Sequence, residues 1–116
     1  MNNLIEMRKQ IDSYSKLEDG WDGYGSDRIS KTSITVAKYI LETIYANWDS
    51  TDKRISIFPM PNGGIQLDIG DLIELEIYNF NVKELVWNEE YSLIKKETKN
   101  YSKIIREKKL RRIIGE

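Results

Sequence analysis

Four carboxylates within the segment 68–76 are the groups of this chain best suited to chemistry: Asp68, Asp71, Glu74 and Glu76. Alternation along a strand would put Glu74 and Glu76 on one face, with Asp68 opposite one of them across a hairpin. Paired carboxylates bind Mg²⁺ or act as acid and base in glycoside hydrolysis. The alternative is a solvated strand face that discourages edge aggregation or accepts the chain's own basic tail.

A second candidate is the segment Gly20–Ser26, in which three glycines, two aromatics and an aspartate rule out regular helix or strand. We predict a specialised loop between two helices, with Trp21, Asp22 and Tyr24 as candidate binding residues. The alternative is structural: Trp21 closes one end of the core and Asp22 accepts local backbone N–H bonds. The segment matches neither a phosphate-binding loop nor a dinucleotide fingerprint.

The third candidate is a basic tail. Residues 1–94 carry 9 Lys and Arg against 16 Asp and Glu, a net charge of −7, whereas residues 95–116 carry 9 against 3, a net charge of +6. Such a tail can bind nucleic acid or an anionic membrane, or it can be a solvated helix that balances the acidic body. The cations that would contact nucleic acid include Lys95, Lys99, Lys103, Arg106, Arg111 and Arg112.

Composition limits the chemistry of these candidates. The chain has 116 residues, 40% of them hydrophobic and 32% charged, which is typical of a single small domain. It contains no Cys and no His, so thiol catalysis, a Ser-His-Asp triad and a Cys/His zinc site are excluded. We expect that the protein is not an enzyme and that it binds neither a cofactor nor a metal ion. No membrane span or signal peptide is evident, which favours a cytoplasmic location.

The elements that position these groups follow from the spacing of apolar residues. A 3.6-residue period predicts helices at 3–18 and 31–48, the second capped by Ser30 and ending its apolar stripe at Trp48. A two-residue period then predicts four strands, at 55–58, 65–69, 73–78 and 84–88. Residues 89–113 have helical composition with poorly phased apolar positions.

The sequence therefore predicts an α+β fold in which two N-terminal helices pack on a four-stranded antiparallel meander, followed by a basic C-terminal helix. Residues 1–94 form the core domain and residues 95–116 its helical extension. We expect the core to contain Leu4, Ile11, Ile34, Leu41, Ile44, Ile55, Ile57, Ile65, Leu67, Ile73, Leu75 and Ile77.

Two motifs together carry a resemblance. The Gly20–Ser26 loop and the later segment Pro59–Asp68 resemble an uncharacterised family of small bacterial and mobile-element proteins, over about residues 15–88. The family strand usually reads Gln-Leu-Glu-Trp where this chain has Gln66-Leu67-Asp68-Ile69. The resemblance supports the domain limits and implies no activity.

These observations favour a non-catalytic, cytoplasmic protein-interaction module with a protein partner. Small acidic mobile-element proteins are often inhibitors or antitoxins, and that analogy suggests the same class here. The predicted binding residues are Trp21, Asp22, Tyr24, Glu74 and Glu76. The alternatives are a nucleic-acid-binding module that uses the tail, and a small-ligand site at the Gly20–Ser26 loop. Formation of a homo-oligomer stays open.

Overall fold

The computed structural model describes residues 4–47 and 54–113, with side chains described as far as Lys108. Its helices are α1 (Leu4–Ser13), a short 3₁₀ turn (Tyr14–Lys16), α2 (Lys31–Asn47) and α3 (Ser102–Ile113). Its strands are β1 (Ile55–Pro59), β2 (Ile65–Ile69), β3 (Ile73–Tyr78), β4 (Asn81–Trp87) and β5 (Leu93–Asn100). The predicted α+β class is confirmed. Trp48, predicted to end the second helix, lies outside the described residues.

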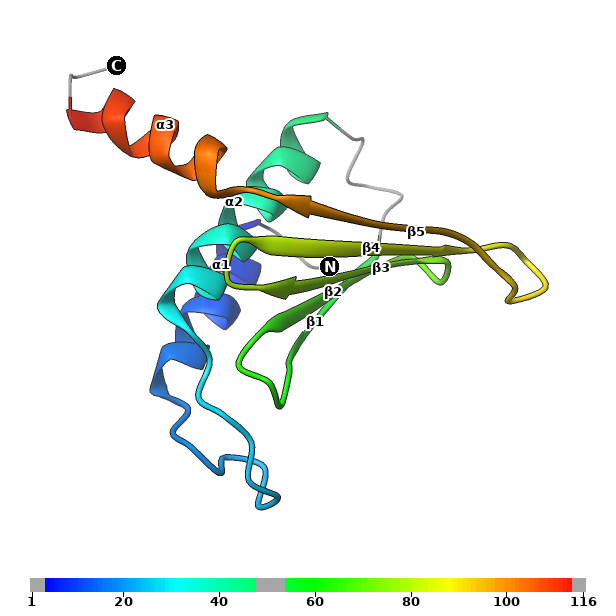
Figure 1. Ribbon diagram of the computed structural model, residues 1–116, viewed down its shortest axis with the longest axis horizontal. Coiled ribbons are helices and arrows are strands. Elements are labelled where there is room, and N and C mark those ends of the chain that lie inside the picture. Colours follow the sequence, from blue (N-terminus) through cyan, green and yellow to red (C-terminus); the bar gives the residue numbers. More distant parts are fainter. Residues whose placement is uncertain (1–3, 48–53, 114–116) are drawn as a thin grey trace.

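The sheet is an antiparallel meander in the order β1-β2-β3-β4-β5 (Figure 1). It therefore has five strands, and the predicted count of four was wrong. The fifth strand occupies residues 93–100, where the sequence predicted helix. All eight of its side chains are exposed, so β5 has no apolar alternation, and its lysines and glutamate suit a helix equally well. α3 follows only after Tyr101.

The helices α1 and α2 cover one face of the sheet (Figure 1). Alternation on β2 and β3 sends Ile65, Leu67, Leu75 and Ile77 into this layer, where all four are buried. Ten of the twelve predicted core residues are buried. The other two, Leu4 and Ile73, are half-buried and pack against the core.

The N-terminus of α2 is fixed by a small polar network. The backbone N–H of Ser33 donates to Oγ of Ser30 at 3.0 Å, which confirms Ser30 as the N-cap. Oγ of Ser30 lies 2.7 Å from Oδ1 of Asn79, and the Asn79 backbone N–H donates to Oγ of Ser33 at 2.7 Å. The network thus ties α2 to the turn between β3 and β4.

Candidate functional site

The Gly20–Ser26 loop is held by its own hydrogen bonds. Oδ1 of Asp22 accepts from the backbone N–H of Tyr24 at 2.8 Å, and the indole N–H of Trp21 donates to the carbonyl of Asp27 at 2.9 Å. Hydrogen bonds from Ser26 and then from Tyr24 hold the pKa of the Asp22 carboxyl below its usual range. Trp21 is half-buried against the core. The structural interpretation thus accounts for two of the three predicted loop residues.

The segment 27–30, which directly follows the Gly20–Ser26 loop, packs against the second motif, a contact that the sequence did not reveal. The backbone N–H of Asp27 donates to the carbonyl of Pro61 at 2.8 Å, and that of Ser30 donates to the carbonyl of Gly63 at 3.0 Å. A side chain at Gly63 would begin 2.9 Å from the carbonyl oxygen of Arg28, where φ of Gly63 is +92°. Gly63 of the second motif therefore allows the segment 27–30 to approach closely.

Tyr24 is the loop residue left for a partner. Its side chain is 92% exposed, at the tip of a loop in which Gly23 and Gly25 both have positive φ. Because the neighbouring Asp22 bonds fix the backbone, the loop presents this ring with little conformational freedom to lose on binding.

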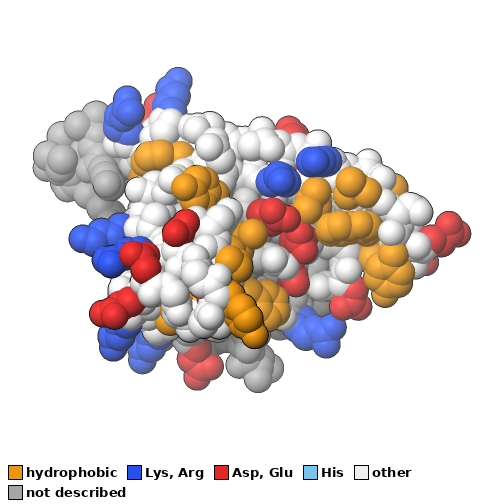
Figure 2. Space-filling view, turned by 60° about the horizontal axis from the view of Figure 1, so that its bottom comes forward, with side chains coloured by type: hydrophobic (Ala, Val, Ile, Leu, Met, Phe, Trp, Pro, Cys, Tyr) orange, Lys and Arg blue, Asp and Glu red, His pale blue; other side chains and the backbone are white. Residues whose placement is uncertain are grey.

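The face of the sheet opposite α1 and α2, called the uncovered face from here on, carries the predicted carboxylates. It is formed by Phe58, Gln66, Asp68, Glu74, Glu76, Tyr78, Lys83, Leu85, Trp87 and Lys96, each on the strand phase opposite the buried positions. The register places Asp68 directly opposite Glu74, and Glu76 opposite Lys83. Figure 2 shows such a surface, with acidic side chains at its centre, lysines beside them and hydrophobic side chains on both flanks.

Glu74 lies in the middle of the carboxylates. Nε2 of Gln66 donates to Oδ1 of Asp68 at 2.9 Å and to Oε1 of Glu74 at 3.0 Å, so one amide bridges the two acids. Burial, then the hydrogen bond and charge of Glu76, then the charge of Asp68 raise the pKa of the Glu74 carboxyl to about 7. Glu76 is 3.9 Å from the ammonium of Lys83. The Glu74 carboxyl is therefore partly protonated in neutral solution, and a bound cation would displace that proton.

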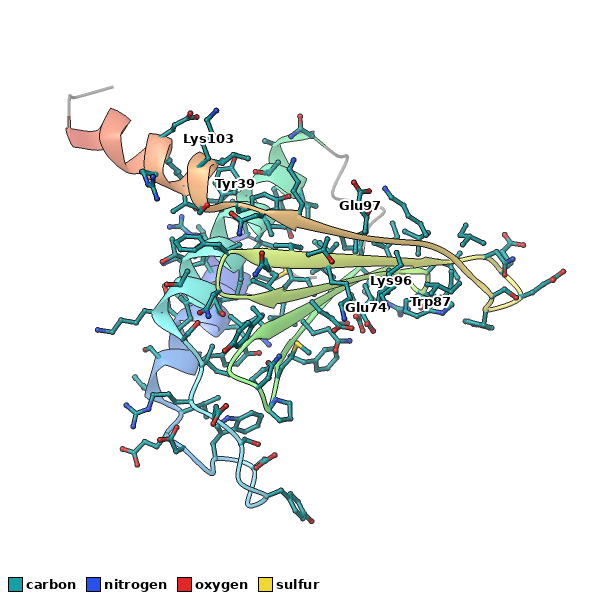
Figure 3. The ribbon with its side chains drawn as sticks, viewed as in Figure 1. Tyr39, Glu74, Trp87, Lys96, Glu97 and Lys103 are labelled. Carbon is teal, nitrogen blue, oxygen red and sulfur yellow. The ribbon has the colours of Figure 1, made fainter. Side chains whose placement is uncertain are left out.

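A shallow hollow of about 200 Å³ lies beside Glu74. Its lining includes Asp68, Glu74 and Trp87, and Figure 3 shows Glu74, Trp87 and Lys96 on the same side of the strands. The sequence analysis missed Trp87 as a site residue. The alternation of side chains along β4 was the available signal. Val82 is buried, and Trp87 lies an odd number of residues further along the strand, so the two side chains point to opposite faces of the sheet. Asp71, in the β2–β3 turn, also lines the hollow, and its carboxylate pairs with Arg54 at 3.1 Å.

The carboxylates do not form a metal centre. Among the described residues, no group of three or more His, Cys, Asp or Glu side chains could hold a metal ion. The arrangement offers acceptors to a cationic side chain instead.

The basic segment is divided between a strand and a helix. The ammonium of Lys95 lies 2.6 Å from Glu84 and 3.3 Å from Glu97, and Lys99 lies over the Tyr101 ring, 5.2 Å from its centroid. Two of the three lysines of β5, Lys95 and Lys99, are thus engaged within the chain.

The remaining predicted nucleic-acid contacts belong to α3. Lys103 and Arg106 are exposed there, whereas the side chains of Arg111 and Arg112 lie outside the described part of the chain. The ammonium of Lys108, on the same helix, lies 3.0 Å from Glu42. Of the predicted nucleic-acid contacts whose side chains the structure describes, Lys103 and Arg106 are therefore the two that are exposed and have no partner given above.

A groove of about 470 Å³ marks where the helix layer ends. It runs between α2 and strands β3 to β5, with Ile44, Ile73 and Val82 in its lining and Tyr39 and Tyr101 at the end where α3 begins. The two tyrosine rings meet edge to face, with centroids 6.2 Å apart. The groove shows that α1 and α2 leave the outer strands without a helix above them.

Comparisons with protein-family models, with curated proteins and with solved structures give no match to this chain. None of the described helices is long and apolar enough to cross a membrane. The family resemblance of the two motifs therefore stays a prediction, and the function is argued from the geometry of the uncovered face.

Proposed function

We propose that this chain is a non-catalytic, cytoplasmic protein-interaction module that binds a basic partner protein on its uncovered face. The observation that carries the proposal is the hollow beside Glu74, where three carboxylates and an indole line one surface. A lysine or arginine end group would contact Asp68 and Glu74 through charge and Trp87 through its ring. The absence of His and Cys from the sequence supports a role without catalysis.

Aromatic side chains at the other end of the face would add apolar contact. Phe58 is 47% exposed and Tyr78 is 46% exposed, on neighbouring rows of the sheet. Exposed aromatic rings beside charged groups are the residues that most often concentrate binding energy at protein interfaces. Because small acidic mobile-element proteins are often inhibitors or antitoxins, we propose by analogy that the module belongs to that class.

The raised pKa of Glu74 gives the proposal a pH signature. A bound cation would stabilise the ionised carboxylate, so binding must displace the proton that Glu74 holds below its pKa of about 7. Affinity for the partner is therefore expected to be higher at pH 8 than at pH 6.

Affinity capture with two charge-matched double variants tests the proposal. Glu74→Gln with Glu76→Gln removes two carboxylates from the uncovered face, and Glu89→Gln with Glu90→Gln removes two exposed carboxylates from the β4–β5 turn. We expect the partner captured from the native host by wild-type protein to be lost with the first variant and kept with the second. Equal capture by both variants would contradict the proposal.

Nucleic-acid binding is the second candidate, and Lys103 and Arg106 favour it because both are exposed on the same helix. Removing residues from Lys95 onward would destroy β5, so charge reversal of these two side chains is the better probe. If they bind phosphates, Lys103→Glu with Arg106→Glu abolishes a salt-sensitive gel shift. A small-ligand site at the loop has less support, because Trp21 and Asp22 are used within the loop.

A further inference from the structure

Strand β5 is an open sheet edge. It pairs with β4 on one side only, and its eight residues are all exposed (Figure 1). The opposite edge, β1, has five residues and ends at Pro59, which cannot donate a ladder hydrogen bond. β5 contains no proline, and its one irregularity, opposite Val86 and Trp87, lies at its start. Lys95–Asn100 therefore present a regular row of unpaired backbone groups.

Two copies of such an edge can pair with each other only in certain registers. Residues that oppose each other in an antiparallel ladder point their backbone groups either both toward or both away from the partner strand. Along one strand the direction of the backbone groups alternates from residue to residue. Even-numbered residues of one copy must therefore lie opposite even-numbered residues of the other copy. The two-fold axis then passes midway between the two copies of one residue. The helices of both copies lie on the same side of the joined sheet.

The charges of β5 select one of these registers. Figure 3 shows Lys96 and Glu97 on opposite sides of the strand, so each side chain meets only the partner side chains of its own face. An axis at Lys95, Lys96, Glu97 or Lys99 places two like charges directly opposite each other. An axis at Thr98 opposes Thr98 with Thr98 and matches Glu97 with Lys99 twice. Threonine pairs and opposite charges are favourable cross-strand neighbours.

We propose that two copies of this chain pair through β5, antiparallel and with the two-fold axis at Thr98. Lys96 then lies opposite the partner's Asn100, and the exposed Ile94, 62% accessible in the single chain, lies beside the partner's Ser102. The like charges that an axis at Lys95, Lys96, Glu97 or Lys99 would oppose disfavour those four registers. Both uncovered faces lie on the same side of the resulting sheet, although the pairing does not depend on what those faces bind.

A cysteine scan of β5 tests the register, because the chain has no cysteine of its own. Thr98→Cys brings two thiols into direct opposition, and we expect mild oxidation to give a covalent dimer. Lys96→Cys faces the partner's Asn100 and is expected to stay largely unlinked under the same conditions. A dimer from Lys96→Cys that equals or exceeds the one from Thr98→Cys would overturn the register.

A charge swap tests the pairing without any cross-link. Glu97→Lys opposes lysines at two symmetric positions, and we expect the dimer dissociation constant, measured by sedimentation, to rise roughly tenfold from two altered cross-strand pairs. Glu97→Lys combined with Lys99→Glu restores both pairs and should restore the dissociation constant. Wild-type protein that stays monomeric at millimolar concentration, or a double variant no tighter than Glu97→Lys, would overturn the proposal.

Discussion

On strand β3, Leu75 and Ile77 point toward the helices whereas Glu74 and Glu76 point away from them, so adjacent residues of one strand enter two different environments. The covered face is apolar and buried, and its packing stabilises the fold. The uncovered face combines carboxylates, lysines and half-exposed aromatics, which contribute little to stability. The comparison indicates that substitutions on the two faces have separate effects. Those on the covered face lower the stability of the fold, and those on the uncovered face weaken binding.

The largest loss of stability is expected at Gly64, where the backbone of β3 leaves no room for a side chain. A Cβ at Gly64 would lie 2.2 Å from the carbonyl oxygen of Ile77, so Gly64→Ala cannot be accommodated while β2 pairs with β3. We expect a loss of more than about 4 kcal/mol, the extreme range for single substitutions. Urea denaturation measures it. Gly23→Ala is the control: its Cβ meets open space, and only its positive φ is strained, at about 1–2 kcal/mol.

Neighbouring residues of β3 test the difference between the faces directly. Ile77 is fully buried, and Ile77→Ala is expected to cost about 2–5 kcal/mol in the free energy of unfolding. Tyr78 is 46% exposed on the uncovered face, and Tyr78→Ala is expected to cost less than about 1 kcal/mol. Similar losses for both variants, measured by thermal or urea unfolding, would contradict the assigned strand phase.

The same contrast holds within the Gly20–Ser26 loop. Trp21 is half-buried and hydrogen-bonded to Asp27, so Trp21→Ala is expected to cost about 1–3 kcal/mol, less than for a fully buried ring. Tyr24 is 92% exposed, and Tyr24→Ala is expected to stay within about 0.5 kcal/mol of wild type. Differential scanning calorimetry of the two variants measures both losses of stability. A stable Trp21→Ala would remove the structural role of that indole.

The last prediction is a pH dependence of stability that arises from Glu74. Its pKa is raised from 4.5 to about 7 in the folded chain, so folding favours the protonated carboxyl. The stability that this proton provides is complete below pH 4.5 and is lost as the pH rises through 7. Glu74→Gln cannot titrate, and its melting temperature is therefore expected to gain on wild type between pH 5 and pH 8. A constant difference across this range would mean that Glu74 has an ordinary pKa.

Residue spacing was enough to predict the two N-terminal helices, the first three strands and most of the core, because Ile and Leu recur with a clear period in those elements. β5 escaped prediction because an edge strand with both faces in solvent needs no apolar alternation, and its Lys-Lys-Glu run suits a helix as well. The fourth strand was placed three residues late because Asn81 and Lys83 are polar positions at the rim of the uncovered face. In both cases solvent exposure removed the pattern.

The candidate site was predictable in part. Alternation placed Glu74 and Glu76 on one face, but their opposition to Asp68 and Lys83 depends on strand register, which turn geometry fixes. The contact between the segment 27–30 and residues 61–63 is long-range, and no local pattern encodes it. Trp21 and Asp22 were predicted as binding residues because loop aromatics and acids look alike in sequence, whether they bind the chain itself or a partner.

In-cell photo-cross-linking tests the central claim, that the uncovered face binds a partner protein, and it works with a partner of any identity. A photoreactive phenylalanine analogue replaces Phe58 or Tyr78 on the uncovered face, and Ile5, which is 67% exposed on α1, as the control. We predict one discrete product, containing the same second protein, from positions 58 and 78 and none from position 5. The same product from position 5, or no product from either position of the uncovered face, would contradict the account.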